Sequence, residues 1–132
     1  MASGIERLIS PTLFPPPGYS HAVVTRAPAT VWTAGGVPLD ASGELVGPGD
    51  VAAQARQVVQ NLTVALRDAG AAPEDVVRTT VYVVTADRAD LGVVWDEVQA
   101  SGFASAASTL LGVGLLGYEG QLVEIEATAV LG

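Results

Sequence analysis

The sequence of 132 residues contains no cysteine and no lysine, and it has one histidine, His21. Without cysteine the chain can form no disulfide, no thiolate nucleophile and no zinc–sulfur site. Without lysine it offers neither Schiff-base catalysis nor the lysine of a phosphate-binding loop. A single histidine cannot build a multi-histidine metal site. We therefore expect no metal ion and no cofactor.

Positive charge is also scarce, because 6 basic residues, all of them arginine, stand against 14 acidic residues and give a net charge of −8. A chain with this balance and no basic stripe is a poor partner for nucleic acid. Its beginning lacks the apolar core of a signal peptide, and no apolar run approaches the length of about 18 residues that a membrane span needs. These absences predict a cytoplasmic protein that binds neither nucleic acid nor membrane.

Charged residues make up 15% of the chain and apolar residues 49%, which is enough for a large core. The length fits a single domain, 1–132. Four of the eight prolines lie between Ser10 and Gly18, so an extended N-terminal connector without helix is predicted over residues 1–18. The weakly charged surface is a first sign of self-association.

Apolar spacing and capping residues predict two helices. Asp50 caps a helix that runs to Ala69, with polar residues such as Gln54 on its outer surface, and Asp87 caps a second helix that ends near Ala100. A bend is expected at Gly35-Gly36 and a turn at Ala27-Pro28. Runs of β-branched and aromatic residues predict strands at Tyr19–Thr25, Thr30–Ala34, Val76–Val84, Ser108–Leu116 and Gln121–Leu131.

The last of these strands has two unlike faces, because side chains alternate along a strand. One face is apolar and consists of Val123, Ile125, Ala127 and Ala129. The other face mixes apolar and acidic residues and consists of Leu122, Glu124, Glu126, Thr128 and Val130. Two helices can cover only one face of such a sheet. We therefore expect neighbouring subunits to cover the second face, with its carboxylates in a wet interface.

Four segments of the sequence resemble the Rid family, the reactive-intermediate deaminases, which are also called YjgF proteins or L-PSP endoribonucleases. These segments are Pro17–Ala22, Ala34–Pro38, Asp50–Leu62 and Val123–Ala127. The resemblance extends over nearly the whole chain. It implies an α+β, chorismate-mutase-like fold, with a mixed sheet and two helices packed on one face. It also implies a homotrimer with a ligand pocket at each subunit interface.

The sequence departs from this family at the position that holds the substrate. The enamine and imine deaminases of the family bind the substrate carboxylate through an arginine in a Pro-Ala-Arg-Ser segment. The matching stretch here is Ser105–Thr109, where Ala107 takes the arginine position, and no basic residue follows Phe103. The family's helix asparagine falls near Trp95. The chain thus resembles an arginine-lacking branch, and 2-aminoacrylate is expected to be a poor substrate.

The resemblance makes Glu124 the glutamate of the pocket. The ligand-binding positions that it implies are Tyr19, Gly35, Gly36, Trp95, Ala107, Thr109 and Tyr118. Without a cation, burial of a free carboxylate is strongly unfavourable, whereas the aromatic positions offer apolar, stacking and hydroxyl contacts. We therefore expect a small-molecule ligand that is less polar than an amino-acid-derived enamine.

Each candidate also has a purely structural interpretation. Glu124 is either a general acid/base or an interface carboxylate that accepts hydrogen bonds. Trp95 either contacts the ligand or packs in the core, and Gly35-Gly36 either presents N–H groups to a ligand or serves a turn. Glu126 is expected to be exposed or paired with an arginine. His21 is expected to be structural, although its type suits a proton shuttle.

Two functions remain open at this point. The first is an enzyme that acts on an enamine, an imine or a related reactive intermediate at an inter-subunit pocket, with Glu124 as the acid/base. The second is a non-catalytic trimer that binds or senses a small molecule. RNA cleavage, an older description of the family, is disfavoured by the net charge of −8.

Overall fold

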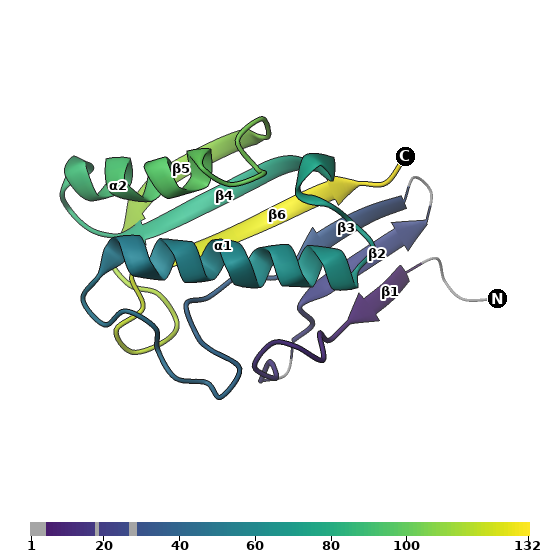
Figure 1. Ribbon diagram of the computed structural model, residues 1–132, viewed down its shortest axis with the longest axis horizontal. Helices are drawn as coiled ribbons and strands as arrows, with labels where there is room; N and C mark the ends of the chain where they lie inside the picture. The colour runs from purple at the N-terminus through teal and green to yellow at the C-terminus, as the bar shows by residue number, and fades with distance from the viewer. Residues whose placement is uncertain (1–4, 18, 27–28) are drawn as a thin grey trace.

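The computed structural model of the chain describes residues 5–17, 19–26 and 29–132. A six-stranded mixed sheet forms one layer, and two helices form the other (Figure 1). The strands lie in the order β1-β2-β3-β6-β4-β5, and only the β4–β5 pair is parallel. The elements are β1 (Ile5–Leu8), β2 (Ala22–Arg26), β3 (Ala29–Thr33), α1 (Val51–Asp68), the 3₁₀ helix η1 (Pro73–Asp75), β4 (Val76–Val84), α2 (Arg88–Gln99), β5 (Ala107–Val113) and β6 (Val123–Val130).

Helix α1 begins and ends where the sequence predicts. The Asp50 side chain accepts a hydrogen bond of 3.0 Å from the backbone N–H of Ala53 and so caps the first turn. Gly70 follows the C-cap residue with a φ of 91°, a backbone conformation that glycine adopts without strain. The apolar stripe of α1, which includes Leu62 and Leu66, is buried against the sheet.

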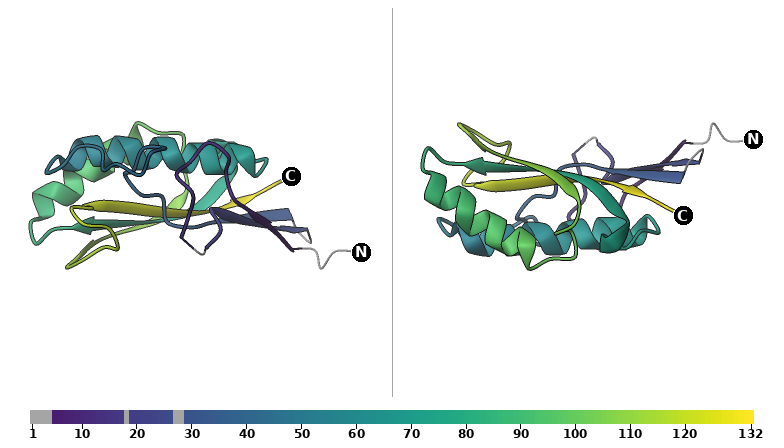
Figure 2. Two further views of the ribbon diagram at one scale, coloured as in Figure 1. Left: turned by 90° about the horizontal axis from the view of Figure 1, so that it is seen from below. Right: turned by 90° about the horizontal axis from the view of Figure 1, so that it is seen from above.

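Helix α2 connects the parallel strands β4 and β5, which need a crossover of this kind. Asp87 caps it by accepting a hydrogen bond of 2.9 Å from the N–H of Ala89. Val94 and Val98 are buried beneath it. Both helices lie on the same face of the sheet (Figure 2). The expected α+β fold, with two helices on one face of a mixed sheet, is confirmed.

Among the described residues, no helix lies on the face of the sheet opposite α1 and α2 (Figure 2), and we call it the open face. Along β6 the predicted alternation is confirmed, because Ile125 and its apolar neighbours are buried while Glu126 and Val130 are exposed. On β3, Trp32 lies beside Thr128 of β6 and is 50% exposed. The open face therefore combines large apolar groups with carboxylates.

The structure corrects three predicted boundaries and adds one strand. β1 lies inside the predicted connector 1–18 and pairs with β2; its 4 residues are too few to show a periodic pattern. β2 begins at Ala22 instead of Tyr19. β5 ends at Val113 and β6 begins at Val123, since residues 114–122 form a loop between them. The predicted Ala27-Pro28 turn lies outside the described residues.

Candidate functional site

The centre of the site is Glu124, a half-buried residue of β6. Beside it, the bend at Gly35 is attached to β6 by two backbone hydrogen bonds, from Gly36 N–H to Ile125 O (2.7 Å) and from Ile125 N–H to Gly36 O (3.2 Å). A Cβ atom at Gly35 would lie 2.3 Å from Oε2 of Glu124. Only glycine therefore allows the carboxylate to lie against the bend.

One oxygen of this carboxylate is fixed by a buried glutamine. Gln121, which is 3% exposed, donates hydrogen bonds of 3.1 Å to Oε1 of Glu124 and to the carbonyl of Val123. Its own side-chain oxygen accepts a hydrogen bond from the backbone N–H of Tyr118. Gln121 thus connects the loop 114–122 to the candidate acid/base. The sequence alone does not reveal this role, because no motif distinguishes this glutamine from an exposed one.

A pair of tyrosines faces the carboxylate. The pKa of Tyr19 is raised from its ordinary 10.0 to about 12, first by burial, then by a hydrogen bond and an electrostatic interaction with Tyr118, and last by the charge of Glu124. Tyr19 therefore keeps its proton at physiological pH and can serve as a hydrogen-bond donor. It cannot serve as a base in that range.

These groups meet at a cavity of about 300 Å³, which we call the Glu124 cavity. It is lined by Tyr19, Ala34, Gly35, Val37, Tyr118 and Glu124. The structure thus brings together four of the residues that the resemblance implied. Gly36 lies at the bend behind them, and its N–H donates to Ile125. The N–H of Gly36 is therefore engaged in the fold and is not available to stabilise an oxyanion.

Three implied ligand positions lie elsewhere in the chain. Trp95 is on α2 and packs against the hydrophobic core in the helix layer. Ala107 and Thr109 are exposed residues of β5, the strand at the edge of the sheet. Thr109 accepts a hydrogen bond of 2.7 Å from the guanidinium of Arg78, the residue that lies beside Ala107 on β4. None of these residues lines the Glu124 cavity within one chain.

The second carboxylate of the open face has its own partner. Glu126 is exposed and accepts a hydrogen bond from the hydroxyl of Tyr82. That bond is the largest cause that raises the pKa of Tyr82, followed by burial and by the charges of Glu126 and Glu124. Glu126 is thus exposed, as expected, and its partner is a tyrosine.

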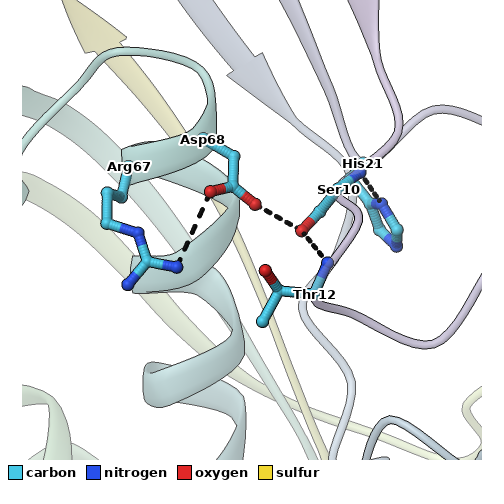
Figure 3. Close-up of polar contacts among 5 residues, drawn as sticks. All are labelled: Ser10, Thr12, His21, Arg67 and Asp68. Carbon is cyan, nitrogen blue, oxygen red and sulfur yellow. Dashed lines mark hydrogen bonds and ion pairs between the residues drawn. The ribbon is translucent and has the colours of Figure 1, made fainter.

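His21 lies in a different cluster, between the N-terminal segment and α1 (Figure 3). Its Nδ1 accepts a hydrogen bond of 2.8 Å from the N–H of Ser10, and its Nε2–H donates to the carbonyl of Phe14 at 3.1 Å. Burial lowers the pKa of His21, while the Phe14 carbonyl and the charge of Asp68 act in the opposite direction. Both ring nitrogens are engaged, which is the arrangement of a structural histidine.

The ranges that the structure describes contain no group of three His, Cys, Asp or Glu side chains that could hold a metal ion. In the same ranges, no helix is both long and apolar enough to cross a membrane.

The chain is similar in sequence and fold to proteins of one known family. The model of the Endoribonuclease L-PSP family matches residues 12–131. The 2-iminobutanoate/2-iminopropanoate deaminase of Mus musculus is 37% identical over 135 residues, which cover 100% of this chain and 96% of the relative. A Rid protein of unknown function from Yersinia pestis, YyfB, is 41% identical and superposes with a TM-score of 0.74, covering 97% of this chain and 99% of its own.

A protein with a more distant sequence also shares the fold. RidA from an Antarctic Psychrobacter bacterium is 26% identical and has a TM-score of 0.84, with coverage of 96% of this chain and 99% of its own. The family model and the relatives agree over nearly the whole chain, and their solved structures share its sheet and helices. The chain therefore belongs to the Rid/YjgF family, whose family model carries the description Endoribonuclease L-PSP.

Proposed function

We propose that the chain is a Rid-like deaminase that hydrolyses a neutral imine or enamine at the Glu124 cavity. Membership of a family with 2-imino acid deaminases supports action on reactive C=N compounds. The observation that carries the proposal is the setting of Glu124. Its carboxylate is held by Gln121 and faces a cavity with two tyrosines.

The chemistry of such a site is the addition of water to a C=N bond. Glu124 takes a proton from water while the oxygen attacks the carbon, and passes that proton to the nitrogen to give a carbinolamine. Glu124 then takes the proton of the carbinolamine hydroxyl, the C–N bond breaks, and the same proton passes to the departing nitrogen, which leaves as ammonia. The net reaction converts an imine and water into a carbonyl compound and ammonia. An enamine enters the same sequence after its carbon has been protonated.

The charge of the site favours a neutral substrate. None of the described residues that line the Glu124 cavity is a cation, and Glu124 itself repels an anion. Ala107 stands where the family's carboxylate-binding arginine is expected, and the neighbouring Arg78 guanidinium is bonded to Thr109. A free carboxylate would therefore enter the cavity without a counter-ion, at a large desolvation cost.

We also propose that the protein is a cytoplasmic homotrimer and that the open face lies between its subunits. The open face carries the half-exposed Trp32 and Val130, the latter 40% exposed. Ala107 and Thr109 sit on the outermost strand of this face, so a neighbouring copy can bring them to the Glu124 cavity. Light scattering should give three times the chain mass of 13.4 kDa; a monomer at micromolar concentration would contradict the trimer.

The substrate proposal can be tested with imines made in situ. A flavin amine oxidase acting on a short primary alkylamine such as propylamine supplies a neutral imine, and an amino acid oxidase acting on alanine supplies 2-iminopropanoate. We expect the protein to accelerate release of the carbonyl product from the neutral imine, and to act about tenfold or more less efficiently on the acid. Preference for the acid would contradict the neutral-substrate proposal. Acceleration of neither reaction by a folded protein would favour the non-catalytic binding trimer.

A further inference from the structure

A second cavity adjoins the Glu124 cavity. Both cavities include Tyr19, Ala34, Gly35, Val37 and Tyr118 in their linings. The second cavity lies between α1 and the segment Ser10–Pro17; we call this segment the arm and the cavity the arm cavity. The side chains that line only the arm cavity are mostly apolar and include Leu13, Phe14, Leu39, Leu62 and Ala65.

The polar side chains that line only the arm cavity, Asn61 and His21, are already engaged within the protein. The amide nitrogen of Asn61 donates hydrogen bonds of 2.8 Å to the carbonyls of Val37 and Leu39, and its oxygen accepts one of 2.9 Å from Gln57. Both ring nitrogens of His21 are bonded to the backbone of the arm. A polar ligand group would find no partner from these side chains, so the arm cavity suits an apolar group.

The arm is fixed in place by contacts with two other elements. The hydroxyl of Ser10 donates to Asp68 of α1 and accepts a hydrogen bond of 3.1 Å from the N–H of Thr12 (Figure 3). The ring of Phe14 packs on Gly43, where a Cβ atom would lie 2.4 Å from the ring. The wall of the arm cavity is therefore formed before a ligand arrives, which limits the entropy lost on binding.

We infer that the arm cavity receives the apolar substituent of the substrate whose C=N group lies at Glu124. This inference rests on the proposed function and defines its substrate class as neutral imines or enamines with a short aliphatic side chain. The two linings share five residues, so a molecule of this shape can occupy both cavities at once. Leu13 and Phe14 of the arm are then the residues that determine substrate length.

Primary amides test this inference without turnover, because an amide group is a neutral, planar mimic of an imine. Acetamide, propanamide, butanamide and 3-methylbutanamide are titrated into the ¹⁵N-labelled full chain, and the backbone resonances of Gly35 and Gly36 report binding. The arm cavity is small, about 30 Å³. We therefore expect the affinity to rise about fourfold for each of the first one or two added methylenes and then to level off, because only these methylenes leave water for an apolar wall.

Substitutions in the arm test whether the gain in affinity with amide length arises in the arm cavity. Leu13→Trp fills the arm cavity and should remove the gain with chain length while the affinity for acetamide stays unchanged. If the tryptophan variant does not melt cooperatively, Leu13→Ala takes its place and should shift the preference to a longer amide. The control is Leu115→Ala, at a side chain that is 84% exposed and lines neither cavity; it should leave the series unchanged.

An affinity that stays flat from acetamide to 3-methylbutanamide in the wild-type protein would overturn the inference, and so would a folded Leu13 variant with an unchanged series. The outcome is separate from that of the proposed function. A rising series in a protein that hydrolyses no imine would support the arm cavity and reject the enzyme. Equal affinity for all four amides in a protein that hydrolyses neutral imines would reject the role of the arm cavity and support the enzyme.

Discussion

The Glu124 cavity and the His21 cluster both contain a titratable group held by hydrogen bonds, but they leave that group in opposite situations. His21 uses both ring nitrogens to bind the backbone of the arm. In Glu124, Oε1 accepts a hydrogen bond from Gln121, and the carboxylate lines an open cavity. By residue type, histidine is the better proton shuttle near neutral pH. We nevertheless propose Glu124 as the catalytic group, because its carboxylate faces the Glu124 cavity.

A large loss of activity is expected from Gly35→Ala, which displaces the Glu124 carboxylate. The added Cβ would lie 2.3 Å from Oε2, so the carboxylate has to move, and imine turnover should fall by about 100-fold. The fold should tolerate the change, because a flexible side-chain end can give way. Gly117→Ala is the control, since a Cβ there meets nothing within 4 Å. Full activity of a folded Gly35→Ala protein would show that the position of Glu124 does not matter.

A smaller effect is expected on the His21 side, and it concerns stability. The pKa of His21 is lowered in the folded protein from its ordinary 6.5, so the unfolded chain binds more protons between the two values. The stabilising contribution is complete above about pH 6.5 and is lost as the pH falls toward the folded value. Protonation also removes the acceptor that Nδ1 offers to Ser10.

His21→Gln isolates this contribution, because glutamine can hydrogen-bond to the arm but does not titrate. Melting temperatures at pH 7.5 and pH 5.5 are compared for both proteins. The melting temperature of the wild type should fall more between pH 7.5 and pH 5.5 than that of the variant. At pH 7.5 the variant should have the same imine turnover per folded protein as the wild type. An equal fall in melting temperature in the two proteins would show that the pKa of His21 does not change on folding.

The regular elements could be predicted wherever a long pattern and a cap coincide. α1 and α2 begin directly after Asp50 and Asp87, whose side chains accept hydrogen bonds from the first turn. β4 has the predicted bounds because nine consecutive residues favour a strand. β1 could not be predicted, since it depends on its pairing with β2 and has no pattern of its own.

The site could be predicted only in part. The resemblance supplied Glu124, and the position of Gly35 followed from the bend. Gln121 and Gln54 could not be found in this way, and Gln54 was assigned to the helix surface although its exposure is 0%. Gln54 accepts a hydrogen bond of 2.7 Å from the N–H of Leu122 and donates one of 3.0 Å to the carbonyl of Gly120. Such roles depend on contacts 66 and 68 residues apart.

The central claim is that Glu124 carries the chemistry, and β6 supplies a matched pair of carboxylates for the test. Glu124 and Glu126 lie on the same face of one strand, but only Glu124 lines the cavity. The decisive measurement is turnover of the neutral imine by Glu124→Gln and Glu126→Gln, at equal amounts of folded protein. Glu124→Gln should lower turnover by about 100-fold or more and leave the assembly intact, while Glu126→Gln should stay close to the wild type. An active Glu124→Gln protein, or equal losses in both variants, would contradict the claim.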